Sequence, residues 1–148
     1  MNKKLVIEHL SRLLDEKIMV LKSNRRTLTE VRDNETKCTV GDKYETGRAM
    51  AQMELEKCQF QLTKTEDLKT ILMQINPTKA SESVTFGSLI ETTEDNYFLS
   101  IAFGRIIVTG ESIFCISPVS PIGKMLLGKS VGEQVNFQDK KIKIKAIQ

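Results

Sequence analysis

Apolar residues in the first half of the chain recur at helical spacing. Leu14, Leu21 and Leu28 repeat every seven residues, and Ile18 lies four residues after the first and three before the second. This spacing is typical of the seam of a coiled coil. The remaining seam positions are polar, namely Ser11, Arg25 and Arg32. The pattern predicts one long helix whose apolar seam weakens toward its far end.

A second helical pattern follows after a break between Val31 and Tyr44. Asp33-Asn34 and residues 39–42, within the break, have turn-forming chemistry. Five residues fit a second seam: Ala51, Cys58, Leu68, Leu72 and Ile75. Three further apolar residues leave its register open: Met50, Met53 and Phe60. Because the connection is short, we expect antiparallel helices, with arms of about 30 residues that extend roughly 45 Å at the helical rise.

The second half of the chain alternates with the period of two that strands have. Asn76-Pro77 ends the second helix, because proline disfavours helical backbone in the residue before it. Residues 77–82 form a polar linker. Six segments then predict strands: 84–90, 97–103, 106–109, 112–117, 134–137 and 141–147.

One short helix interrupts these strands. Ser120 caps it, Pro121 takes its first position and Gly128 ends it. The sequence therefore predicts an α+β protein. An antiparallel coiled-coil hairpin covers residues 1–76, and a small antiparallel β domain with one short helix covers residues 83–148.

The composition disfavours several functional classes. The three cysteines and the single histidine are scattered, so neither a zinc site nor a disulfide framework is expected, and a reducing cytoplasm fits. Trp is absent and aromatic residues make up 5%, which argues against a large aromatic-lined pocket and a small-molecule substrate. The apolar runs are too short to span a membrane. Residues 1–40 carry the positive excess, with nine Lys and Arg against six Asp and Glu.

Residues 117–133 carry a specific motif, S-P-V-S-P-I-G-K-M-L-L-G-K-S-V-G-E. It resembles the C-terminal signature of the Gre-type bacterial transcript cleavage factors, S-P-x-S-P-I/L-G/A-R/K-x-L-L/I-G-K/R-x-x-G-D/E. The stretch Leu21-Lys-Ser-Asn-Arg-Arg26 is similar to an L-K-x-x-x-R stretch near that family's N-terminus. The resemblance implies a C-terminal domain of FKBP-like topology that docks at the mouth of the secondary channel of RNA polymerase. The hairpin would then descend toward the polymerase active site.

The tip of the hairpin matches the family pattern G-D-x-x-E, as Gly41-Asp42-Lys43-Tyr44-Glu45. The resemblance implies that Asp42 and Glu45 help the polymerase to hold a second Mg²⁺ ion and an attacking water, and that the polymerase then cleaves its own backtracked RNA. Two carboxylates suit Mg²⁺, which needs few protein ligands. The chain would need no cofactor in isolation and would not be an enzyme by itself. Asp42 and Glu45 also fit a capping box, a purely structural reading.

The sequence predicts two further groups of site residues. The surface of this chain that docks on the polymerase would comprise Ser117, Pro118, Ser120, Pro121 and Ile122, where two prolines fix the backbone, although the prolines also suit a turn with no partner and Ile122 also suits the core. Contacts to the 3′ segment of the nascent RNA would come from Lys22, Arg25, Arg26 and Arg32. These four residues fit a solvated helix face equally well.

Two alternatives to a cleavage factor stay open. The family usually continues its tip as N-A-E-Y, whereas this chain has Thr46-Gly47-Arg48-Ala49, so it could occupy the channel without supporting cleavage, as inhibitory relatives do. It could also be a coiled-coil interaction protein that shares only the C-terminal module.

Overall fold

The computed structural model describes the backbone of residues 1–38 and 42–148, and the side chains of residues 1–34 and 45–148. The chain packs as two compact units. One comprises Met1–Ser11 with Thr70–Gln148, and the other comprises Arg12–Lys69. The predicted division at residues 76 and 83 follows the secondary structure instead, and it stays a prediction.

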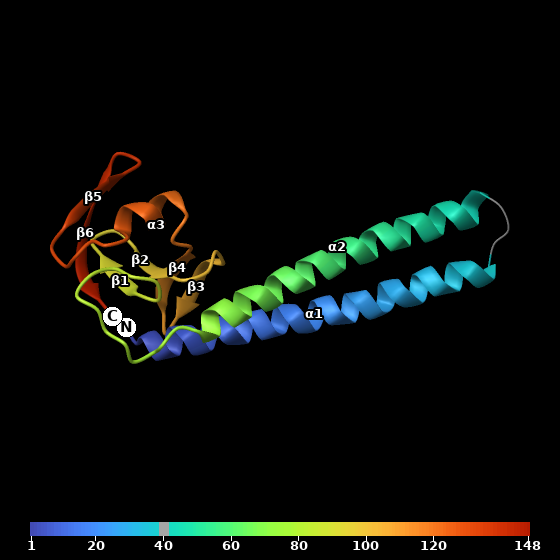
Figure 1. Ribbon diagram of the computed structural model, residues 1–148, viewed down its shortest axis with the longest axis horizontal. Helices are drawn as coiled ribbons and strands as arrows, with labels where there is room; N and C mark the ends of the chain where they lie inside the picture. The colour runs from blue at the N-terminus through green and yellow to red at the C-terminus, as the bar shows by residue number, and fades with distance from the viewer. Residues whose placement is uncertain (39–41) are drawn as a thin grey trace. The chain divides into compact units, whose positions relative to one another are not determined.

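Two long helices precede six strands and a short helix, as the sequence predicts (Figure 1). Helix α1 spans Lys3–Cys38 and helix α2 spans Asp42–Met73. The break between them is shorter than predicted, because α1 continues through Asp33-Asn34. Asp33 is exposed, and its carboxylate accepts a bond of 3.3 Å from Arg32 Nε. An exposed helical surface therefore accommodates the two residues that predicted a turn.

Contacts across the unit Arg12–Lys69 run in opposite directions along the two helices. Cys58 Sγ donates to the Leu21 carbonyl at 3.3 Å, and the Lys69 ammonium pairs with Asp15. Residues later in α1 thus meet residues earlier in α2, which makes the helices antiparallel, as predicted. The apolar centre of this unit consists of Leu21, Cys58 and Leu62, with Ile18 and Leu28 packed against it.

One heptad repeat describes the buried seam positions of α2. Ala51, Cys58, Thr65 and Leu72 are buried at intervals of seven residues. Met50, Met53 and Phe60, which left the register open in the sequence, are 63%, 68% and 70% exposed. Thr65 takes a seam position that an apolar pattern misses, because its hydroxyl donates to the Gln61 carbonyl at 2.7 Å and so stays satisfied.

The strands form one six-stranded sheet in the order β3-β4-β2-β1-β6-β5. Their bounds are β1 Leu89–Thr92, β2 Asn96–Leu99, β3 Gly104–Val108, β4 Glu111–Ile116, β5 Gln134–Phe137 and β6 Lys140–Ile147. The prediction of a wholly antiparallel sheet is wrong at one pair, since β2 and β4 are parallel. The β3–β4 hairpin folds back so that β4 lies between β3 and β2, and β4 therefore runs in the direction of β2.

The first two strands are shorter than predicted. Residues 84–88 form a turn, in which the Ser88 N–H donates to the Thr85 carbonyl at 3.0 Å. Gly87 has φ +89°, and a Cβ there would lie 2.9 Å from Ile75 Cγ2. Only glycine fits this close approach at positive φ. Strand β1 therefore begins at Leu89 rather than at residue 84.

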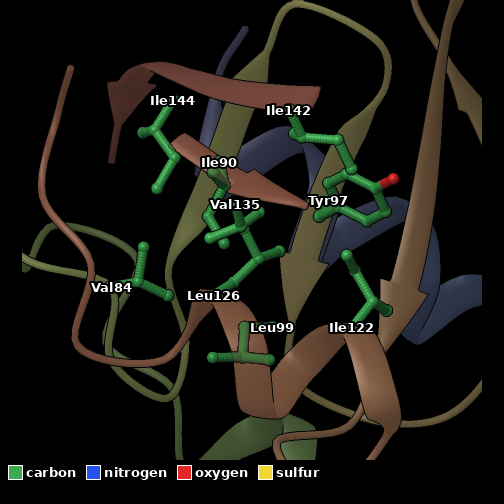
Figure 2. Packing of buried hydrophobic residues seen from close by; sticks show 9 residues of the cluster. All are labelled: Val84, Ile90, Tyr97, Leu99, Ile122, Leu126, Val135, Ile142 and Ile144. Carbon is green, nitrogen blue, oxygen red and sulfur yellow. The ribbon is translucent and has the colours of Figure 1, made fainter. Parts of the chain in front are cut away.

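Helix α3, Pro121–Leu126, contributes Ile122 and Leu126 to the main core. Figure 2 shows these side chains gathered with residues of β1, β2, β5 and β6. The whole cluster comprises Val84, Ile90, Tyr97, Leu99, Ile122, Leu126, Val135, Ile142 and Ile144. Along residues 1–38 and 42–148, no helix is long and apolar enough to cross a membrane.

Candidate functional site

The turn before α3 is held by its own hydrogen bonds. Ser120 is the N-cap, with φ −67° and ψ 156°, and its Oγ accepts from the Gly123 N–H at 3.1 Å. The same hydroxyl donates to the Ser117 carbonyl at 2.6 Å, and the Ser120 N–H donates to that carbonyl at 3.1 Å. Pro121 takes the first helical position, where its missing N–H would have no helical partner. The turn is thus rigid before it meets any partner.

The exposed part of this turn differs from the predicted docking set. Ser117 and Pro118 are half-buried, whereas Pro121 is exposed. Ile122 is buried in the core, so it supplies packing rather than exposed surface. Val119 was missed by the sequence reasoning, yet it is 75% exposed. Its position between two prolines of the predicted turn is the signal that could have found it.

A cavity of about 280 Å³ adjoins the turn. Ile116 and Ile122, which flank Ser117–Pro121 in the sequence, both line it. The other apolar lining comes from Tyr97, Phe114, Phe137 and Ile142, and the polar lining from Glu94, Asp95, Gln138 and Lys140. The cavity is small, but three of the chain's eight aromatic residues meet there. The low aromatic content of the whole chain therefore gave no sign of this cluster of three aromatic side chains.

Tyr97 gives the cavity a hydrogen-bond donor. Its ring centroid lies 6.1 Å from that of Phe114. Burial raises the pKa of the Tyr97 hydroxyl above its usual value, and the nearby charges of Asp95 and Glu94 raise that pKa further. The hydroxyl therefore stays protonated at neutral pH. The cavity can take an apolar group, and carboxylates lie among its lining residues.

The predicted acidic tip is only partly within the described residues. Glu45 lies in the first turn of α2 and is exposed. The side chain of Asp42 lies outside the described residues, and so does the predicted pairing of Asp42 with Glu45. Within residues whose side chains are described, no three His, Cys, Asp or Glu residues gather that could hold a metal ion. A single exposed carboxylate fits only an ion whose other ligands come from elsewhere.

The four basic residues predicted to contact RNA divide into two pairs. Arg25 Nη1 donates to Gln59 Oε1 at 3.1 Å, and Arg32 Nη1 donates to Gln52 Oε1 at 3.0 Å. Both bonds join α1 to α2, so these arginines take part in the helix pairing. Lys22 and Arg26 are exposed. They line a shallow hollow on α1 together with Arg25.

Comparison with protein families addresses the C-terminal half of the chain. Residues 79–148 match the family described as "Transcription elongation factor, GreA/GreB, C-term". The matched residues, 79–148, thus resemble the C-terminal domain of that family. They contain all six strands, α3, the rigid turn and the adjoining cavity. The two long helices lie before the matched residues.

Two further comparisons, with solved structures and with curated proteins, add no argument about function. Among solved structures, this chain is similar to the crystal structure of Thermus aquaticus Gfh1, with 19% sequence identity and a TM-score of 0.35. The alignment covers 92% of this chain and 92% of that chain. Similarity at that level carries no argument about the tip or about activity. No curated protein matches the chain.

Proposed function

We propose that this chain is a transcription elongation factor that binds RNA polymerase at the secondary channel and stimulates cleavage of backtracked RNA. One observation carries the proposal: a match to the GreA/GreB C-terminal domain over residues 79–148, which present a rigid Ser-Pro turn beside an aromatic cavity. Two long antiparallel helices precede this domain in the chain. As an accessory factor, it acts on the active site of the polymerase.

Docking uses the rigid turn together with the cavity. Val119 and Pro121 offer exposed apolar contacts, and the cavity beside them accepts an apolar side chain of the polymerase. Full burial of one such side chain is worth about 1.5–3 kcal/mol. Because the Ser120 hydrogen bonds already order the turn, little conformational entropy is lost on binding. Glu94 and Asp95 favour a basic neighbour on the partner.

The tip supplies the chemical contribution. Asp42 and Glu45 would lend carboxylate oxygens to a Mg²⁺ ion shared with the polymerase, which activates the attacking water and stabilises developing charge in phosphodiester cleavage. Glu45 is exposed and so is accessible to such an ion. Lys22 and Arg26 are exposed cations that suit the nascent RNA 3′ segment.

A second function is favoured by the residues that follow the tip. Thr46-Gly47-Arg48-Ala49 departs from the family's usual N-A-E-Y. Gly47 lies within the second turn of α2 and costs about 1 kcal/mol of helix stability relative to alanine. A factor with this tip would occupy the channel and regulate the polymerase without supporting cleavage.

Binding to core polymerase tests the docking proposal. Val119→Glu places a charge at a 75% exposed position of the turn without disturbing the core, and Val131→Glu makes the same change at a 55% exposed position elsewhere in the domain. We expect the first variant to weaken binding at least tenfold and the second to bind as the wild type does. Equal binding by all three proteins would rule out the turn as the docking surface.

A further inference from the structure

Strand β6 presents a row of lysines on its exposed side. Lys141, Lys143 and Lys145 are exposed, and they alternate with Ile142 and Ile144, which are 2% and 0% exposed. Residues 140–148 contain four lysines and no acidic residue. Because the two isoleucines are buried in the core, the alternate side chains of the strand point to solvent. The three lysines occupy those alternate positions, so the strand itself places them on the exposed side.

The charges of this row are not neutralised within the domain. Among residues 1–34 and 45–148, no ion pair involves Lys141, Lys143 or Lys145. The neighbouring strand β1 carries one carboxylate, Glu91, which is half-buried and pairs in register with Ala146. Glu133, whose carbonyl accepts from the Ile144 N–H, directs its carboxylate to the Ser130 N–H. The three lysines are therefore available to solvent ions or to an anionic partner.

The other neighbour, β5, adds neutral polar groups. Gln134 pairs in register with Lys143, and Asn136 pairs with Lys141. Both amides are exposed. Side-chain amides donate hydrogen bonds to phosphate and sugar oxygens. No large apolar side chain is exposed on either strand among the described residues, although protein interfaces usually have an apolar centre and are depleted in lysine.

We propose that the row Lys141–Lys143–Lys145 binds the phosphate backbone of nucleic acid without reading its sequence. Alternate residues of an antiparallel strand stand roughly 6.8 Å apart, so the row is a regular line of point charges over roughly 14 Å. A regularly charged polyanion matches such a line. Phe137, the aromatic residue of β5, packs against the core, which leaves base stacking out of the contact. This site is separate from the docking turn and does not depend on polymerase binding.

Fluorescence anisotropy with labelled single-stranded RNA and with duplex DNA tests the proposal, since both carry a negatively charged phosphodiester at every nucleotide. The variant changes Lys141, Lys143 and Lys145 to Gln. A control chain carries three equivalent changes at exposed helical lysines, Lys17→Gln, Lys57→Gln and Lys64→Gln, so that net charge is matched. Urea unfolding midpoints confirm that both variants are folded. The single variant Lys143→Gln serves if the triple β6 variant does not fold.

Each phosphate neutralised on a single strand contributes about 0.7 to the slope of log affinity against log salt. The wild type should therefore lose roughly 20-fold more RNA affinity than the β6 variant between about 50 and 200 mM salt, a slope difference of about 2. For Lys143→Gln alone, the slope should fall by about 0.7. The helical control should keep the wild-type slope.

Three results would overturn the proposal. The first is an unchanged slope in the β6 variant. The second is an equal loss in the helical control, which would mean that general charge and not this row binds RNA. The third is competition by poly-glutamate as effective as that by RNA at equal charge, which would identify the partner as an acidic polypeptide.

Discussion

Replacing Ser120 with alanine removes both hydrogen bonds that its hydroxyl makes in the turn before α3. One satisfies the Gly123 N–H at 3.1 Å, and the other reaches the Ser117 carbonyl at 2.6 Å. Loss of an N-cap hydroxyl costs about 0.5–2 kcal/mol, and the second bond adds about 0.5–1.5 kcal/mol. We therefore expect Ser120→Ala to lower the free energy of unfolding of this domain by about 1–3.5 kcal/mol.

The matched control is Ser120→Thr, which retains a hydroxyl at the same position and should lose less than half as much stability. Urea unfolding followed through the NMR signals of Leu126 and Val135 reports on the core beside the turn. Amide hydrogen exchange at Gly123 reports on the cap itself. The reasoning is refuted if Ser120→Ala unfolds at the wild-type urea concentration, or if the threonine variant loses as much stability as the alanine variant.

Two further predictions concern stability. Burial raises the pKa of the Cys115 thiol from 9.0 to about 12; because the folded pKa is the higher one, stability from this thiol is fully present below pH 9 and is lost as the pH rises toward 12. Between pH 9 and 12 the free energy of unfolding should therefore fall less steeply with pH in Cys115→Ala than in the wild type. An equal fall in the two proteins would refute the raised pKa of the Cys115 thiol. Leu62 is 1% exposed and Met53 is 68% exposed, so Leu62→Ala should destabilise the helix pair by about 2–5 kcal/mol in thermal unfolding followed by circular dichroism, whereas Met53→Ala should change it by less than about 0.5 kcal/mol. Similar effects of the two substitutions would contradict the register of α2.

The sequence predicts what depends on local periodicity. The heptads of α1 and the alternation of β6 each place apolar residues on one side of an element, and the structure confirms both. The N-cap at Ser120 was also predictable, because a serine followed by proline has a specific local meaning. These features need no knowledge of distant parts of the chain.

Features that depend on distant residues were missed. Strand β1 starts late because Gly87 lies against Ile75, which is twelve positions earlier. The parallel pairing of β2 with β4 depends on where the β3–β4 hairpin folds back. The cavity combines residues from four separate segments, between Glu94 and Ile142, so no single motif reveals it. Asp33-Asn34 were predicted to form a turn, but they lie within α1. Their preference for a turn is weaker than the preference of the surrounding residues for helix.

The most direct test of the proposed function is RNA cleavage in backtracked polymerase complexes with the wild type and with Asp42→Asn combined with Glu45→Gln. Asn caps helices about as well as Asp, and Gln can replace Glu in a capping box. The double variant should therefore melt as the wild type does and bind polymerase at fixed salt, yet fail to stimulate cleavage, because neutral amides are poor Mg²⁺ ligands. Full stimulation by a normally folded double variant would contradict the role of the tip. A wild type that binds but never stimulates cleavage would contradict the cleavage function and favour channel occupation instead.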